Sequence, residues 1–301
     1  MIDISQWVLL SILASIFQVI RNAFSKSLKE HFSDLDITAI RFIFGLPFIL
    51  IIFITLNPKT TLSWLTYNTF IYVSTGACFQ ILGTYFLLQC FKFKSFAIGI
   101  TFSKLEAVFA AGIGIIVFAE AIKIEGLFFI LLSLIGLLLI FTKSIKKFSL
   151  TDKKQLKCSF DGLLCGLFFA TSSVFFRHAN LNIASIDSPI LKGVNTLLIA
   201  IIVQSIIVTI YLIIKKKSIF FSQNKKSFPK SIGVGFFGIA ASCCWFTAFT
   251  EANAAYVKTV GQIEVLFSIA VSLIVFKEKI TKKEFFAMMI ICYCVLGLNT
   301  L

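Results

Sequence analysis

The feature that most constrains this chain is a series of long apolar runs with little polar sequence between them. Ten runs are long enough to cross about 30 Å of hydrocarbon as a helix, which rises about 1.5 Å per residue. They lie near residues 6–24, 37–56, 67–91, 96–118, 126–142, 161–181, 190–214, 232–250, 254–276 and 285–301. Peptide groups cannot stay unpaired in lipid, and the runs are too long for barrel strands. We therefore expect an all-α membrane protein with ten transmembrane helices.

The composition agrees with this expectation. Hydrophobic residues make up 58% of the chain and charged residues 14%, against about 45–50% and 25% in soluble domains. Seven of the eight cysteines lie inside apolar runs, and only Cys158 lies in a polar stretch. With just two histidines to accompany them, we interpret the cysteines as small hydrophobic residues, and we expect no metal and no cofactor.

The basic residues are clustered rather than spread over one face. The net charge is +14, but the clusters are short and separate apolar runs, so they do not indicate nucleic-acid binding. Twenty lysines follow the first, third, fifth, seventh and ninth runs, while the opposite connections and both chain ends carry about four basic residues. By the positive-inside rule, the sequence predicts that both termini lie outside the cytoplasm.

The two halves of the chain are related by an internal repeat. Residues 100–122 align with residues 258–280 without a gap, and the same register places Glu106 on Glu264 and Glu120 on Glu278. Each copy has five spans, an odd number, so the copies cross the membrane in opposite senses. We predict two inverted five-helix repeats, residues 1–142 and 161–301, joined by a basic connecting loop at 143–160. Inverted repeats are typical of secondary transporters, whose site lies near mid-membrane between the halves.

The ends of the two repeats also carry a family resemblance. The segments 91–136 and 249–297 each contain a helix that ends in Val-Phe-x-Glu and is followed by a last apolar span. This pattern resembles the EamA-like branch of the drug/metabolite transporter superfamily. The resemblance implies export or exchange of small metabolites, such as amino acids or amphipathic and cationic compounds, across a bacterial inner membrane.

The chain departs from that family pattern in two places. Many members have a basic loop after the second span and cytoplasmic termini, whereas here the loop is 57–62, with a single lysine, and the orientation is reversed. Many members also have proline in the middle of the fourth and ninth spans, where this chain has Glu106-Ala107 and Glu264-Val265. The family's site chemistry is therefore not transferred to these positions.

Two glutamates at membrane depth are the first candidates for a functional site. A charge near the bilayer centre costs at least about 2.5–3.5 kcal/mol, and Glu106 and Glu264 lie in the middle of the fourth and ninth spans. In one interpretation they line a cavity and bind a substrate amine or a proton. In the other they pack between helices, paired with Lys104, Lys258 or Gln262.

Four further residues are secondary candidates. Arg41 and Lys192 lie near the ends of the second and seventh spans, where they would either act as gates or extend to the membrane surface. Arg177, like Arg21, closes a span, where a solvated end is the simpler interpretation. Trp245 would line a cavity or face lipid.

Two other function classes, a membrane-embedded transferase and a non-transporting accessory protein, have less support in the sequence. A membrane-embedded transferase would need a reactive cluster, and the sequence offers only His31 and Asp36 in an H-x-x-x-x-D spacing within a loop. A non-transporting accessory protein would be expected to carry a soluble tail, which the sequence does not have. No G-x-x-x-x-G-K-[ST] loop occurs, so no ATP-binding subunit is expected. The expected partners are a small-molecule substrate, the lipid bilayer and, as a candidate coupling ion, the proton.

Overall fold

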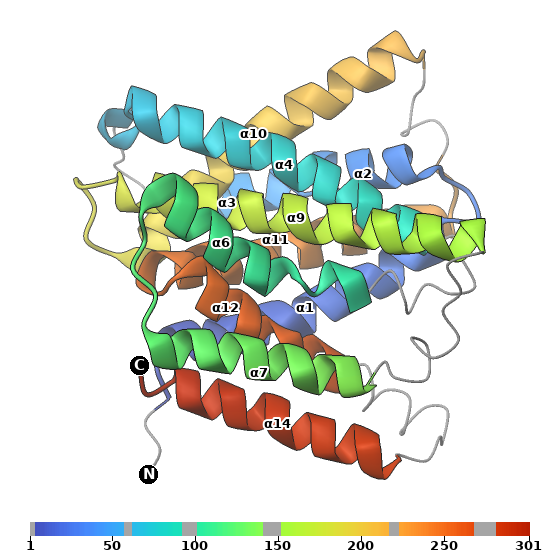
Figure 1. Cartoon of the computed structure of the whole chain (residues 1–301). Helices are drawn as coiled ribbons and strands as arrows, with labels where there is room; N and C mark the ends of the chain where they lie inside the picture. Colours follow the sequence, from blue (N-terminus) through green and yellow to red (C-terminus); the bar gives the residue numbers. More distant parts are fainter. Residues whose placement is uncertain (1–3, 57–61, 92–100, 141–151, 217–222, 268–280) are drawn as a thin grey trace.

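The computed structural model describes residues 4–56, 62–91, 101–140, 152–216, 223–267 and 281–301, and these residues form helices without strands. The helices are α1 (Gln6–Leu28), α2 (Asp34–Ile43), α3 (Leu46–Leu56), η1 (Leu62–Trp64), α4 (Tyr67–Cys90), α6 (Glu106–Phe118), α7 (Ile124–Ile140), α9 (Lys153–Leu181), α10 (Pro189–Ile214), α11 (Ser227–Glu251), α12 (Ala254–Val260), η2 (Gly261–Ile263) and α14 (Lys282–Leu298). Figure 1 shows them as a bundle of roughly parallel and antiparallel rods.

The helix starts follow from local sequence. At α2, Ser33 and Asp36 form a reciprocal capping box, which satisfies backbone N–H groups that have no partner within the helix. At α10, the Ser188 side chain accepts from the Leu191 N–H and Pro189 occupies the first turn, where its missing N–H costs nothing. The Asp152 side chain caps α9 in the same way. These caps place helix starts at polar residues just outside the apolar runs.

Seven segments are long and apolar enough to cross a membrane by length and composition. They are Gln6–Leu28, Asp34–Leu56, Tyr67–Cys90, Thr101–Phe118, Lys153–Leu181, Pro189–Ile214 and Ser227–Glu251. Two shorter apolar helices, Ile124–Ile140 and Phe285–Leu298, correspond to the predicted fifth and tenth spans. The predicted ninth span is described only to residue 267. Ten spans therefore remain a prediction, whereas an all-helical, multi-pass membrane protein is established.

Several predicted boundaries are corrected. The first span was expected to end near 24, but α1 continues to Leu28. The second span is divided into α2 and α3 at Phe44 and Gly45. A Cβ on residue 45 would lie 2.8 Å from the Arg41 carbonyl oxygen, so glycine suits this turn. α9 begins at Lys153, before the expected start at 161, because Asp152 caps its first turn.

The main helix contacts join the first half of the chain to the second. α1 packs along α11, α4 along α9, α6 against α12, and α10 against α2, α3 and α4. α7 and α14 also pack together, and Figure 1 shows them side by side at the bottom of the bundle. Gly76 and Gly83 allow α4 to approach α9 closely, since a Cβ at either position would lie 2.8 Å from a phenylalanine ring of α9. The hydrophobic core is thus built between the two halves.

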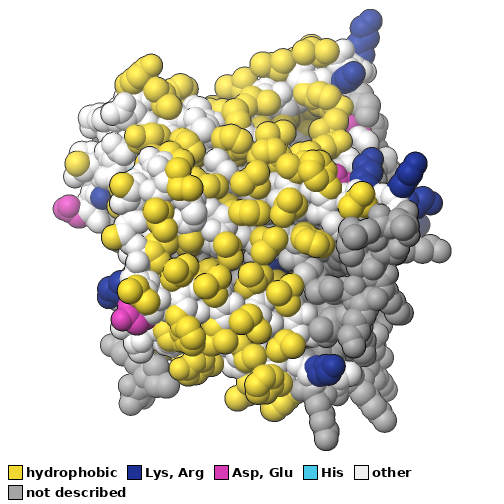
Figure 2. All heavy atoms as spheres, in the orientation of Figure 1, with side chains coloured by type: hydrophobic (Ala, Val, Ile, Leu, Met, Phe, Trp, Pro, Cys, Tyr) yellow, Lys and Arg dark blue, Asp and Glu magenta, His cyan; other side chains and the backbone are white. Residues whose placement is uncertain are grey.

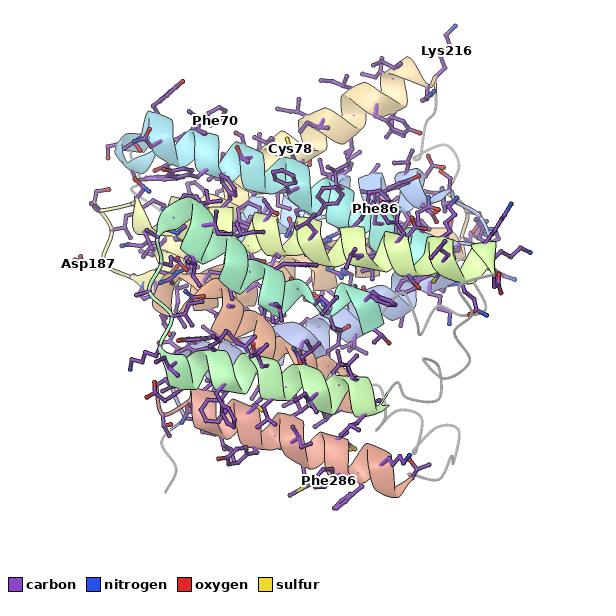
Figure 3. The ribbon with its side chains drawn as sticks, in the orientation of Figure 1. Phe70, Cys78, Phe86, Asp187, Lys216 and Phe286 are labelled. Atoms are coloured by element: carbon purple, nitrogen blue, oxygen red, sulfur yellow. The ribbon has the colours of Figure 1, made fainter. Side chains whose placement is uncertain are left out.

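The face of the molecule in Figure 2 carries a broad apolar band among the described residues, with charges at its two margins. Large exposed side chains such as Ile116, Ile214 and Phe286 are 84%, 71% and 61% exposed, which is the pattern of a surface in lipid rather than in water. The ends of α10 mark the two margins, because Asp187 and Lys216 lie on opposite sides of the molecule (Figure 3). The start of α1 and the C-terminus lie on the Asp187 side (Figure 1), where the Ser5 backbone N–H donates to Asn299 Oδ1 at 2.8 Å.

Candidate functional site

Both helices that carry the predicted glutamates are interrupted just before the glutamate. Residues 101–103 form a helical turn, the chain turns at Lys104 and Leu105, and α6 then begins at Glu106. In the second half, α12 ends at Val260, the 3-10 turn η2 follows, and Glu264 comes next. The two breaks fall at the same position of the repeat. In both places i→i−3 hydrogen bonds replace the α-helical pattern, because the Lys104 N–H donates to the Thr101 oxygen and the Glu264 N–H to the Gly261 oxygen. A short 3-10 stretch within a helix often marks a hinge or a functional site.

The two glutamates form crossed ion pairs between the halves of the chain. Lys104 Nζ of the first half lies 2.6 Å from Glu264 Oε2 of the second, and Lys258 Nζ of the second half lies 2.5 Å from Glu106 Oε1 of the first. All four side chains are between 11% and 15% exposed. Charges this deep are stable only when paired. Each carboxylate therefore binds the half that does not carry it.

Polar side chains of α1 and α11 extend this network. Gln18 Nε2 donates to Glu264 Oε2 at 2.9 Å, and Asn22 Nδ2 donates to Glu264 Oε1 at 3.4 Å. The Trp245 indole N–H donates to Gln18 Oε1 at 3.3 Å. The Lys258 ammonium also lies 4.6 Å from the Trp245 ring centroid, a favourable cation–π distance. Four helices thus converge on the two ion pairs.

Two adjacent cavities adjoin the ion pairs. The larger is lined by Gln18, Arg21, Arg41, Gln80, Glu106, Phe169, Ser172, Ser173, Phe176, Trp245, Phe246, Phe249 and Lys258. The smaller is lined by Gln18, Lys104, Glu106, Trp245, Lys258, Gly261, Gln262 and Glu264. The centre of a water molecule can reach about 30 Å³ of the larger and about 10 Å³ of the smaller. That is room for about two waters and one water respectively, so neither cavity has room for a metabolite in this conformation.

Most of the predicted site residues come together here. Glu106, Lys258 and Trp245 line both cavities, and Lys104, Gln262 and Glu264 line the smaller. The Gln262 amide is 2% exposed, and neither its nitrogen nor its oxygen has a hydrogen-bond partner in the described part of the chain. A buried amide without partners is costly in a finished core, so Gln262 stays a candidate for ligand binding.

The four secondary candidates separate into two groups. Trp245 and Arg41 line the larger cavity, and Arg41 is only 6% exposed, so it does not extend to the membrane surface. Lys192 is half-buried and belongs to neither cavity lining. Arg177 lies in a separate cluster with Glu120. The structure therefore joins Arg41 to the site and leaves Lys192 and Arg177 outside it.

The cluster around Arg177 joins the end of α9 to the chain after α6. Arg177 Nε donates to Glu120 Oε1 at 2.8 Å, and His178 Nε2 lies 2.9 Å from the same oxygen. Arg177 Nη1 also donates to the carbonyl oxygens of Phe249 and Ala252. Burial acts to raise the pKa of Glu120, but the neighbouring His178 and Arg177 outweigh it and hold that pKa below its ordinary value. This is a structural clamp at a helix end.

Sequence reasoning missed five polar residues of the larger cavity: Gln18, Arg21, Gln80, Ser172 and Ser173. Arg21 was interpreted as a solvated span end, but α1 continues for another seven residues to Leu28 and buries it to 4% exposure. The available signal was the repeat itself. Arg21 aligns with Arg177 in an Arg-x-Ala pattern, and an arginine repeated at equivalent positions of two apolar runs is unusual in a membrane chain.

The residues of the transferase alternative have structural roles. Asp36 accepts from the Ser33 backbone N–H and hydroxyl as part of the α2 cap, and His31 is exposed in the preceding turn. Within the described ranges, no group of three or more His, Cys, Asp and Glu side chains is placed to hold a metal ion.

Comparison with known proteins now identifies the family. The model of the EamA-like transporter family matches the chain twice, over residues 5–142 and 157–300. The chain belongs to the EamA-like transporter family. This EamA-like protein is a membrane transporter of small molecules, and the two matches agree with its two-repeat organisation.

Structural comparison supports the fold alone. A solved structure described as "Crystal structure of protein" matches with a TM-score of 0.70 and 12% sequence identity, over 99% of this chain and 96% of the other. A comparison with curated protein sequences finds no match.

Proposed function

We propose that this protein is a secondary transporter that exports or exchanges small metabolites, amino acids among them, by alternating access between two inverted five-helix repeats. The repeats are residues 1–142 and 161–301, with ten spans in all and a basic connection at 143–160. The observation that carries the proposal is the pair of crossed ion pairs beside the cavities. They link the two halves at the point where both glutamate-bearing helices are broken.

The geometry supports alternating access because a substrate in these cavities touches both repeats at once. The larger cavity takes its lining from α1, α2, α4 and α6 of the first half and from α9, α11 and α12 of the second. A rocking of one half against the other opens such a site to one side and then to the other. Either ion pair can exchange its partner for a charged group of the substrate, or for a proton, as the halves move.

The lysine partners of the two glutamates bear on the charge of the substrate. Each carboxylate has a lysine partner, so a cationic compound would have to displace an ammonium group before it could bind. Amino acids fit better, because they bring an acid and a base together. The cationic and amphipathic compounds that the sequence also indicates are the weaker alternative.

The orientation and location belong to the same proposal. The start of α1 and the C-terminus lie on the margin opposite Lys216 (Figures 1 and 3), and the basic connections are retained in the cytoplasm. We propose a bacterial inner membrane with both termini on the outer side. No nucleotide or added subunit is needed, since the movement is driven by solute or proton gradients.

Counterflow in proteoliposomes tests the function. Purified protein is reconstituted with no nucleotide, and exchange of labelled acidic, neutral and basic amino acids is measured beside protein-free vesicles. Exchange of at least one class is expected in wild type. It should fall about tenfold or more in Glu106→Gln and Glu264→Gln, and stay unchanged in Glu125→Gln, an exposed glutamate in the first turn of α7. Equal exchange in all four proteins would remove the glutamates from the mechanism.

A further inference from the structure

Two buried arginines line the larger cavity, and neither forms a salt bridge within the described residues, although Glu264 lies near enough to Arg21 to interact with it electrostatically. Arg21 of α1 and Arg41 of α2 are 4% and 6% exposed. Arg21 donates through Nε and Nη2 to Asn22 Oδ1, and Arg41 donates through Nη1 to Thr84 Oγ1. Neither guanidinium has an ion pair with a carboxylate in the described part of the chain. Both therefore differ from Lys104 and Lys258, which do.

The formal charges around the two cavities do not balance. Four cationic side chains, Arg21, Arg41, Lys104 and Lys258, face two carboxylates, Glu106 and Glu264. A guanidinium keeps its proton in proteins, so the cavity walls carry an excess of two positive charges. Burying an unpaired charge is expensive. A protein retains such an excess where an anion completes the site.

The geometry brings the two arginines to the same place. Their side chains pass over Gly238 of α11, where a Cβ would lie 3.6 Å from Arg21 Cδ and 3.6 Å from Arg41 Cγ. Both arginine stems therefore lie near the same point on α11. Each guanidinium has five N–H donors in a planar fork that matches carboxylate and phosphate oxygens. The donors not used by Asn22 and Thr84 remain for a ligand.

Neutral polar groups complete the lining. Gln80 of α4 and Ser172 and Ser173 of α9 contribute amide and hydroxyl groups to the cavity. Around them lie aromatic rings of α9 and α11, including Phe176 and Phe249. Sites for small organic ions usually combine donors that hold the charged end of the ligand with an apolar wall beside them.

We propose that the larger cavity binds the oxyanion group of a small organic anion, a carboxylate or a phosphate, between Arg21 and Arg41. The proposal rests on the proposed function, since the cavity is the one through which the substrate passes. An anion with one or two negative charges offsets the excess left by the lysine–glutamate pairs. The Lys258–Glu106 pair at the other end of the cavity then contacts the rest of the molecule.

A binding panel on the wild-type protein is the first test. Thermal unfolding of detergent-purified protein is followed with increasing L-glutamate, succinate, glycerol phosphate and inorganic phosphate, and with glutamine and putrescine for comparison. A ligand that binds only the folded state raises Tm in a concentration-dependent, saturating manner. We expect at least one of the anions to do so, and putrescine not to. Whether the carboxylates or the phosphates stabilise the protein identifies the group. Stabilisation by putrescine and by none of the anions would overturn the proposal.

Arginine variants locate the anion. Arg21→Gln and Arg41→Gln each remove one guanidinium, and the anion's apparent affinity should fall about 30-fold or more, the effect of about 2 kcal/mol at a buried charge pair. Arg41→Lys keeps the charge without the planar fork and should lie between Arg41→Gln and wild type. Lys192→Gln is the matched control, because the repeat aligns Lys192 with Arg41 and its side chain lines neither cavity. Equal affinity in wild type and the folded arginine variants would refute the assignment.

The outcomes distinguish this inference from the proposed function. Counterflow of neutral or basic amino acids with no effect of any anion would leave the transporter proposal intact and reject the oxyanion site. Anion binding that depends on both arginines, without exchange of any compound, would support the site and reject the transport mechanism.

Discussion

Substituting first one and then both residues of the Lys258–Glu106 pair gives a quantitative test of the crossed ion pairs. At 2.5 Å and an effective dielectric constant near 20, the gross attraction is about 7 kcal/mol, most of which is offset by the desolvation of the two ions. Removing one partner alone leaves a buried charge, which typically costs about 3–5 kcal/mol. Lys258 keeps its contact with the Trp245 ring in Glu106→Gln, so we expect the lower end, about 3 kcal/mol.

The double variant separates pairing from packing. Glu106→Gln with Lys258→Met leaves neither charge unpaired, and the methionine stem retains contact with the indole. We expect it to cost no more than either single change, a coupling of about 3 kcal/mol. The free energies of unfolding would come from equilibrium titration with SDS in mixed micelles, with exposed Glu125→Gln expected within about 0.5 kcal/mol of wild type. Additive single effects would refute the reasoning.

Three further predictions concern parts of the molecule outside the ion pairs. The low pKa of Glu120 stabilises the folded state at pH above about 4.3, the unfolded value, and this stabilisation is lost as the pH falls through the folded pKa; Glu120→Gln should flatten the acid limb of a Tm-against-pH curve, and an unchanged limb would contradict this. Gly261→Ala places a Cβ 2.5 Å from Trp245 Cη2 and should cost about 1–3 kcal/mol of unfolding free energy, whereas Gly112→Ala, with nothing within 4 Å, should cost nothing; equal losses would argue against the close approach. A periplasm-only phosphatase fused to Leu301 should be active and a cytoplasm-only fluorescent reporter dark, and the reverse result would overturn the orientation while leaving the fold unchanged.

The sequence predicted the helical architecture well because the bilayer allows few alternatives. Once peptide groups must be satisfied internally, a run of about 20 apolar residues has only one conformation available. Boundaries were less accurate, because they depend on local caps. Asp152, for example, starts α9 in a polar stretch that hydropathy alone assigns to a loop. At Gly45, where the second span divides, a Cβ would lie 3.1 Å from the Ile239 side chain, and this tertiary contact cannot be seen in the hydropathy pattern.

The candidate site was predicted in part for a similar reason. Glu106 and Glu264 were found because an ionisable residue in the middle of an apolar run is costly, whatever surrounds it. Their partners were named as alternatives. The pairing across the two halves depends on tertiary structure, which no local sequence pattern shows. Arg21 was missed because four more residues of α1 decide whether it lies at a solvated end or in the interior. Lys192 matches Arg41 in the repeat, yet only Arg41 reaches the cavity.

The crossed ion pairs also mean that the two halves are no longer interchangeable parts. In the register that places Glu106 on Glu264, Lys104 aligns with Gln262 and Lys258 aligns with Ile100. A gene duplication starts from a dimer of two first halves. In such a dimer each glutamate would have a lysine partner only from the Lys104 position, because isoleucine occupies the position of Lys258. Each half carries the repeated glutamate, but the lysine lies at a different position of the repeat in each half. Each half therefore supplies a contact that the other lacks. The four charges are paired only when both halves are present. Under the proposed alternating access, an opening toward one side of the membrane would therefore break a chemically different contact from an opening toward the other, and the two openings would differ in free energy.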